Sequence, residues 1–357
     1  MGSASARLPF IDALKAIACQ LIVLHHLAFY GPMSDSAGQL APSLVAWLSD
    51  HARVAVQVFL VIGGFLAAKA LAPEGILLVA SPLAMIRKRY LRLVIPYVLV
   101  LALAVVAAAI AREWMQHDSI PAPPVPAQVV AHVLLLNDLA GFESLSAGVW
   151  YVAIDFQLFV LLLSVLWLAE RLCGSARAQA CLGPAMVSAV GFESLFIFNR
   201  DPDWDAWALY FFGAYAMGVA GFWASNRGRS ALWLAVLLLA VLAALALDFR
   251  LRIAVAVSVA LLLAIARSSG LLARWPRGRS FAFLGRIAYS VFLVHFPICL
   301  LVNAAWSRFV PPEPWFNAAG MVTAWVASVA AGALFYRVVE RPVGDWIARP
   351  RLLAQRA

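Results

Sequence analysis

Charged residues are scarce in this chain. Only 13% of its 357 residues are Asp, Glu, Lys or Arg, whereas 64% are hydrophobic. A soluble domain is about a quarter charged and about half apolar, so the composition excludes an ordinary soluble protein and predicts a polytopic membrane protein. The net charge of +9 would suggest nucleic acid as the partner of a soluble protein. Here we attribute it to basic cytoplasmic loops, and we expect the lipid bilayer, but no nucleic acid, as a partner.

Cysteine pairs and the common catalytic motifs are also missing. The four cysteines lack metal-ligand spacing and imply no disulfide framework, so we expect no metal cofactor. There is no GxSxG elbow, and Gly63 with Gly64 fits close helix packing better than a nucleotide-binding loop. The first apolar segment is too long and too charged for a cleaved signal peptide, and we expect it to remain as a membrane helix.

Apolar runs of about 20 residues, the length that crosses the hydrocarbon core, recur along the chain. They predict an all-α fold with about ten transmembrane helices. Segments 31–53 and 112–147 are the longest connections, and we expect both outside the cytoplasm. Prolines exclude 121–126 from the interior of a helix. The predicted spans are 9–30, 54–72, 91–111, 148–169, 178–198, 207–224, 231–247, 251–267, 282–303 and 316–337.

Basic residues orient these helices. If the N-terminus is cytoplasmic and the spans alternate, 20 lysine and arginine residues fall in inside segments and six in outside segments, with Lys15 within a span. Such an excess is typical of cytoplasmic loops. We therefore predict that both termini are cytoplasmic.

The first predicted helix carries Asp12, Lys15, His25 and His26. Ionisable residues inside a membrane helix usually serve a function. At about 100° per residue, Lys15 and His26 share a face about 16 Å apart, and His25 points roughly 80° away. Asp12 precedes Lys15 by three residues and can pair with it. These features favour His26 over His25 for chemistry, although a snorkelling lysine and an interfacial histidine would give the same pattern.

The basic run at 87–96 begins the third predicted span. Arg89 and Arg92 are three residues apart and share a helical face. Paired guanidinium groups suit phosphate, so the run indicates a site for a phosphorylated cytoplasmic donor. Ordinary anchoring at the cytoplasmic surface is the alternative.

Two later spans hold single ionisable residues. Asp155 follows Trp150 and Tyr151 in an otherwise apolar span, and a carboxylate there needs a partner. It fits a structural ion pair as well as a catalytic site. His295 lies near the middle of a later span, where it is either a buried histidine bonded to another helix or a functional group.

Together these stretches resemble the acyltransferase-3 family of integral membrane O-acyltransferases. IDALKAIACQLIVLHH resembles the family's first-helix pattern, with Lys15 in place of arginine and His26 near the helix end. VQVFLVIGGFLAAK has Gly63 where the family has serine, and VWYVAIDFQLF has Asp155 where it has glutamate. RKRYLRLVIP, LGRIAYSVFLVHFPI and YRVVERP match further family segments, so the resemblance covers nearly the whole chain.

The resemblance implies a single integral membrane acyltransferase domain over residues 1–357 in a bacterial inner membrane. It implies transfer of an acyl group, often acetyl, from cytoplasmic acyl-CoA to a hydroxyl of an extracytoplasmic glycan or lipid-linked saccharide. On this basis we hypothesise that His26 is a general base or acyl acceptor. The hypothesis assigns catalysis to His26, Lys15, Asp12 and Asp155, donor binding to Arg89, Arg92 and Lys15, and acceptor binding to His25, Trp150, Tyr151 and His295.

Two other functions fit the same residues. Intramembrane Lys15, Asp155 and His295 could form the pathway of a proton-coupled transporter or flippase, although no inverted repeat is evident. The departures at Lys15, Gly63 and Asp155 also fit a relative that has lost catalysis and only binds its partners.

Overall fold

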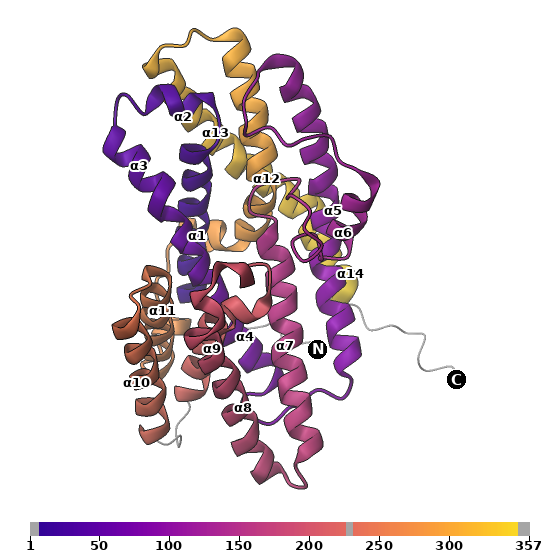
Figure 1. Ribbon diagram of the computed structural model, residues 1–357, viewed down its shortest axis with the longest axis vertical. Coiled ribbons are helices and arrows are strands. Elements are labelled where there is room, and N and C mark those ends of the chain that lie inside the picture. The colour runs from indigo at the N-terminus through magenta and orange to yellow at the C-terminus, as the bar shows by residue number, and fades with distance from the viewer. Residues whose placement is uncertain (1–6, 226–230, 349–357) are drawn as a thin grey trace, which may run out of the picture. The chain divides into compact units, whose positions relative to one another are not determined.

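The computed structural model describes residues 7–225 and 231–348, and no β-strand occurs among them. The chain divides into two compact units. Unit 1 contains Met1–Ile22, His51–Pro82 and Ala153–Arg286, and unit 2 contains Val23–Asp50, Leu83–Val152 and Ile287–Ala357. The α-helices of Figure 1 are α1 (Pro9–Phe29), α2 (Pro32–Ala37), α3 (Pro42–His51), α4 (Val56–Leu71), α5 (Pro82–Trp114), α6 (Pro126–Val133), α7 (Trp150–Leu172), α8 (Ala176–Phe196), α9 (Ala208–Ala224), α10 (Ala231–Leu247), α11 (Leu251–Ser268), α12 (Arg279–Phe309), α13 (Pro314–Phe335) and α14 (Arg341–Ala348).

The predicted all-α membrane architecture is confirmed. In the described part of the chain, eight helices are long and apolar enough to cross a membrane, and two shorter apolar helices accompany them. The ten predicted spans coincide with α1, α4, α5 and α7 to α13, whereas α2, α3, α6 and α14 are absent from the prediction. The count of ten crossings, the cytoplasmic termini and the single domain stay predictions. Some basic residues of the charge count lie outside the described residues, namely Arg227, Arg229, Arg349, Arg351 and Arg356.

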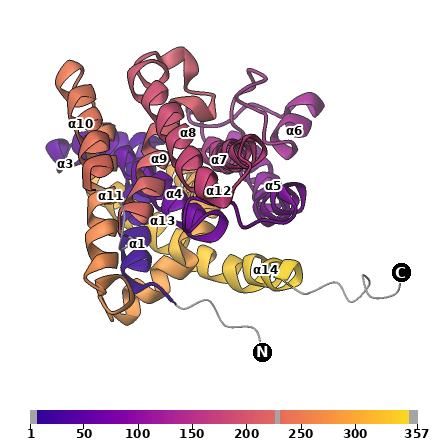
Figure 2. The same cartoon turned by 90° about the horizontal axis from the view of Figure 1, so that it is seen from below.

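Helices α4 and α9 of unit 1 lie side by side with their backbones in close approach (Figures 1 and 2). A Cβ atom on Gly64 would overlap the backbone oxygen of Tyr215, and one on Gly218 would overlap that of Val61. Small residues are what allow membrane helices to pack this closely. The interpretation of Gly64 as a packing residue is therefore confirmed.

Replacing Gly64 with alanine should destabilise the protein strongly. Overpacking a well-packed site costs about 1–3 kcal/mol, occasionally more, and here the obstacle is the backbone of α9 rather than a movable side chain. We expect a clear fall in the thermal midpoint in detergent. Gly174→Ala is the matched control, because no atom lies within 4 Å of the Cβ it would add. Equal midpoints for the two variants would contradict this packing.

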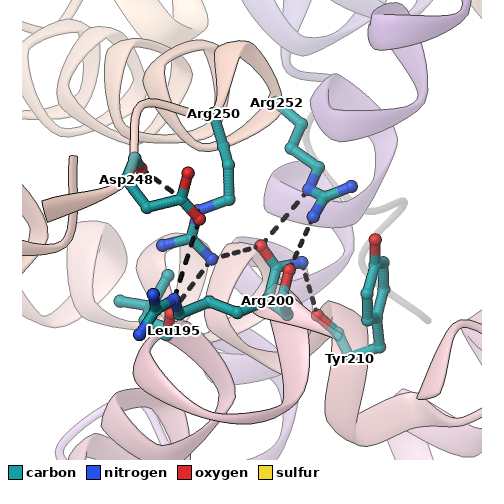
Figure 3. A network of polar contacts seen from close by, with 7 residues as sticks. Leu195, Arg200, Tyr210, Asp248, Arg250 and Arg252 are labelled. Carbon is teal, nitrogen blue, oxygen red and sulfur yellow. Dashed lines mark hydrogen bonds and ion pairs between the residues drawn. The ribbon is translucent and has the colours of Figure 1, made fainter. Parts of the chain in front are cut away.

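An arginine network holds the C-terminal end of α8 to the turn between α10 and α11 (Figure 3). The Arg250 guanidinium donates to Leu195 O at 3.0 Å and to Asn199 Oδ1 at 2.8 Å, and Arg252 donates to Asn199 O at 2.6 Å. Asp248 lies 3.4 Å from Arg250. The last carbonyls of a helix lack partners within it and favour cations nearby, so this network caps α8.

Unit 2 is built around the contact between α5 and α12. The alanines Ala107, Ala108 and Ala111 of α5 pack against Phe296 and Leu300 of α12, all of them buried. Their small side chains let α12 approach α5 closely, as is usual between membrane helices. This contact fixes the part of α12 that carries His295.

The segment after α5 is not a simple connection at the end of this helix, because it folds back along α5. Arg112, near the end of α5, donates to Pro121 O at 2.7 Å, whereas Tyr90, near its beginning, donates to Val133 O at 2.8 Å. These two positions on α5 are separated by about 33 Å at 1.5 Å per residue. The chain therefore runs back along most of α5 between Pro121 and Val133, and α6 lies beside α5 (Figures 1 and 2). We call residues 121–149 the returning segment.

The surface of the returning segment fits the interior of a membrane. Val129, Val130, Leu134 and Leu136 are apolar and exposed, as they would be against lipid. Its irregular part, 134–149, includes fully buried residues. Non-helical backbone at membrane depth is tolerated only where protein covers it or where it lines a cavity. The returning segment also places loop residues beside the histidines of unit 2.

Candidate active site

Two histidines from distant parts of the sequence meet inside unit 2. His26 Nδ1 lies 2.6 Å from His295 Nε2, and their exposed fractions are 8% and 0%. The ring centroids are 4.8 Å apart and the ring planes differ by 11°. This is the geometry of two nearly coplanar imidazoles joined by a hydrogen bond. His26 is on α1 and His295 is on α12, so the sequence separation is 269 residues.

A backbone carbonyl fixes which nitrogen carries each proton. His295 Nδ1 lies 2.7 Å from Phe292 O, and because a carbonyl only accepts, His295 Nδ1 must donate. In a neutral imidazole the other nitrogen then accepts, so His295 Nε2 receives its hydrogen bond from His26 Nδ1. His26 Nε2 is left with a lone pair. This is the tautomer that a general base or nucleophile needs.

The returning segment and the start of α7 surround this pair. Gly148 has φ +79°, which favours glycine, and a Cβ there would lie 3.3 Å from His26 Cε1. The ring of Tyr151 meets Phe292 edge-on, with centroids 5.5 Å apart. His26 also lies 5.5 Å from the ring of Tyr30. The imidazole is therefore packed by aromatic rings and by one glycine loop.

The neighbouring histidine has a different position. His25 Nδ1 donates to Leu48 O of α3 at 3.1 Å, so it ties α1 to α3, whereas His26 joins the pair. This agrees with the preference for His26 that the helical angle predicts. Trp150 packs edge-on against Tyr151 at the start of α7, with centroids 6.3 Å apart.

The arginines of α5 are linked to the helix of His295. Tyr289 of α12 donates to Leu93 O at 3.2 Å, next to exposed Arg92. His295 lies six residues further along α12, a rise of about 9 Å. Arg89 is half-buried, one turn before Leu93. Unit 2 therefore contains both the arginine pair and the histidine pair, connected by one helix.

Unit 1 contains the remaining candidates. Asp12, expected to pair with Lys15, receives a hydrogen bond from Arg7 at 2.8 Å. Asp155 is 7% exposed, and a Cβ on Gly63 would lie 3.7 Å from its Oδ1. Gly63 and Asp155, two of the three positions at which this chain departs from the family pattern, are therefore neighbours in space. Lys15 is half-buried on α1.

The chain matches the model of one known family over most of its length. The acyltransferase-3 family, described as an acyltransferase domain, matches residues 8–337. The chain belongs to this family. Every candidate residue named above lies within the match. The family and the membrane helices together show that the protein is a membrane acyltransferase, an enzyme that transfers acyl groups other than aminoacyl groups. Neither the curated proteins nor the solved structures include a match. Among the described residues, no cluster of three or more His, Cys, Asp or Glu could hold a metal ion.

The acyltransferase also contains polar atoms that the sequence does not single out. Tyr97 Oη, Asn137 Oδ1 and Ser146 Oγ are buried and have no hydrogen-bond partner among the described residues. A buried polar atom without a partner costs about 1–3 kcal/mol of folding free energy, so such atoms are candidates for binding a ligand. Asn137 and Ser146 lie on the returning segment, and the ring of Tyr97 lies nearly parallel to that of His132 of α6, with centroids 6.4 Å apart.

Proposed function

We propose that this acyltransferase moves an acyl group, specifically acetyl, from cytoplasmic acyl-CoA to a hydroxyl of an extracytoplasmic glycan or glycolipid in a bacterial inner membrane. The observation that carries the proposal is the chain of hydrogen bonds from His26 through His295 to Phe292 O. It leaves His26 Nε2 as a base inside a buried, aromatic site. Acyl transfer to a hydroxyl needs such a base.

In the proposed reaction, His26 Nε2 takes the proton of the acceptor hydroxyl while the hydroxyl oxygen attacks the carbonyl carbon of the thioester. The carbon–sulfur bond then breaks, and the leaving thiolate receives the proton from His26 Nε2. The hydrogen bond to His295 stabilises the imidazolium while it exists. In a two-step variant, His26 Nε2 itself accepts the acyl group and passes it to the hydroxyl.

The other candidate residues take supporting roles in this proposal. Arg89 and Arg92 bind the phosphates of the donor. Lys15 supports negative charge near the donor, with Asp12 orienting it. The remaining candidates contact the acceptor or orient His26 in this proposal, and they are Asp155, His25, Trp150 and Tyr151.

Replacing Arg89 or Arg92 with glutamine should weaken coenzyme A binding by about tenfold or more. Hydrogen bonds to charged groups contribute about 1.5–3 kcal/mol, and guanidinium groups bind phosphate with two such bonds. Arg87→Gln is the matched control, since Arg87 is exposed and, at about 100° per residue, lies on the opposite side of α5 from both arginines. Calorimetric titration of the purified variants gives the affinities. Equal losses of coenzyme A affinity in all three variants would show that the arginine pair acts only through its net charge and not as a specific phosphate site.

The transporter hypothesis makes an opposite prediction. A donor-dependent enzyme should gain thermal stability from coenzyme A, because a ligand that binds only the folded state stabilises it. A transporter should instead move a glycan-related solute into liposomes without any donor. Stabilisation by coenzyme A without flux supports the proposed function, and flux without coenzyme A binding contradicts it.

A further inference from the structure

Three of the buried, unpartnered atoms of unit 2 lie on α5 and on the segment after α6, and we call Tyr97, Asn137 and Ser146 the cluster. Tyr97, Asn137 and Ser146 have exposed fractions of 0%, 0% and 1%. Tyr97 stacks on His132, and His132 Nε2 accepts a hydrogen bond from the backbone N–H of Leu145, which precedes Ser146. Buried polar groups in folded proteins are nearly always hydrogen-bonded. Two hydroxyls and one amide oxygen without partners in the same cluster therefore indicate a polar ligand.

Along the helix axes, Tyr97 lies between the arginine pair and the histidine pair. On α5, Tyr97 follows Arg92 by five residues, a rise of about 7.5 Å. On the returning segment, Ser146 lies two residues before Gly148, and Gly148 packs against His26. A molecule whose phosphates bind at the arginines and whose reactive carbon reaches His26 would pass Tyr97 and the returning segment.

Coenzyme A has the matching chemistry. Its pantetheine arm joins the diphosphate to the thioester and carries two amide groups, each with one N–H and one C=O. The hydroxyls of Tyr97 and Ser146 can donate to amide carbonyls, and Asn137 Oδ1 can accept from an amide N–H. Irregular backbone at membrane depth is expected where it lines such a passage.

We propose that the cluster of Tyr97, Asn137 and Ser146 binds the pantetheine arm of the acyl donor, so that the returning segment is one wall of the donor channel. This inference rests on the proposed function, in which acyl-CoA is the donor. It adds a binding site for the neutral arm, distinct from the phosphate site at Arg89 and Arg92.

The test compares two ligands that differ only in the arm: coenzyme A and 3′-phosphoadenosine 5′-diphosphate. Tyr97→Phe and Ser146→Ala should each weaken binding of coenzyme A by about fivefold to tenfold, the value of one neutral hydrogen bond. Binding of 3′-phosphoadenosine 5′-diphosphate should not change. Neither variant should lower the thermal midpoint, because the hydroxyl removed has no partner within the described protein.

Tyr90→Phe is the matched control on the same helix. Its hydroxyl is bonded to Val133 O, so the variant should lower the thermal midpoint and keep its affinity for coenzyme A. If wild type binds coenzyme A and both cluster variants bind it equally well, the arm site is wrong while the proposed function stands. An effect confined to the KM of the glycan acceptor would also overturn the arm site. If wild type binds neither ligand, the proposed function fails and the arm site fails with it.

Discussion

Replacing His26 with alanine should lower acyl transfer by about 10³-fold or more while the protein remains folded. A general base contributes about 10²–10⁴-fold, and His26 Nε2 is the nitrogen that the hydrogen bonds to His295 and Phe292 O leave with a lone pair. The loss should appear in kcat, since the donor phosphates bind elsewhere in the proposal. Turnover of labelled acetyl-CoA by purified protein gives the rate.

His117→Ala is the control for this prediction. His117 lies outside the helices, in contact with Ser119 and Asp35, and its loss should leave turnover within a few-fold of wild type. Wild-type turnover in the His26 variant would show that the imidazole takes no part in the reaction. Binding of coenzyme A, measured in parallel, separates a chemical loss from loss of the fold.

His295 should be almost as important, but for a different reason. It touches His26 rather than the reacting atoms in the proposal, and it sets the tautomer and orientation of the His26 ring. Loss of the group that sets the tautomer of a catalytic histidine can cost up to about 10⁴-fold in a Ser-His-Asp enzyme. For His295→Leu we therefore expect a fall in kcat of about 10²-fold or more, with KM for the donor little changed.

The variant His295→Gln distinguishes positioning from simple packing. The amide oxygen of glutamine can accept the hydrogen bond that His26 Nδ1 donates, so this variant should recover part of the lost kcat. Leucine fills the space without accepting. If leucine and glutamine gave the same kcat, or if both lowered the thermal midpoint in proportion to activity, His295 would be a packing residue.

The helices of the fold could be predicted from the sequence because each membrane span is encoded locally. Twenty apolar residues are visible without any knowledge of their neighbours, and α1 begins at the predicted residue and ends within one. The helical angle also separates His26 from His25, and the structure gives them different partners. Both predictions depend only on the order of residues within a single helix.

The partnership of His26 with His295 could not be predicted in the same way. His295 alone fits a buried structural histidine as well as a functional one, and only folding brings it to an atom 269 positions away. The pairing of Asp12 with Lys15 stays a prediction, and the structure adds a hydrogen bond from Arg7 to Asp12 that the spacing within the helix does not indicate. Partners across space are not encoded in local spacing.

The returning segment was the largest difference from expectation. Its prolines at 121–126 correctly excluded a long helix, and they made an external loop the natural interpretation. The hydrogen bonds of Tyr90 and Arg112 reveal instead that the chain descends along α5. The apolar residues of 129–136, interrupted by His132, were the available signal in the sequence, but this run is too short to resemble a span.

The most direct test of the central claim is the fate of the label when purified wild-type protein in proteoliposomes receives radiolabelled acetyl-CoA and a glycan acceptor. We expect an alkali-labile acetyl ester on an acceptor hydroxyl, with one coenzyme A released for each ester formed and with both products lost in His26→Ala. Release of coenzyme A without ester, or ester formation that persists in His26→Ala, would contradict the central claim.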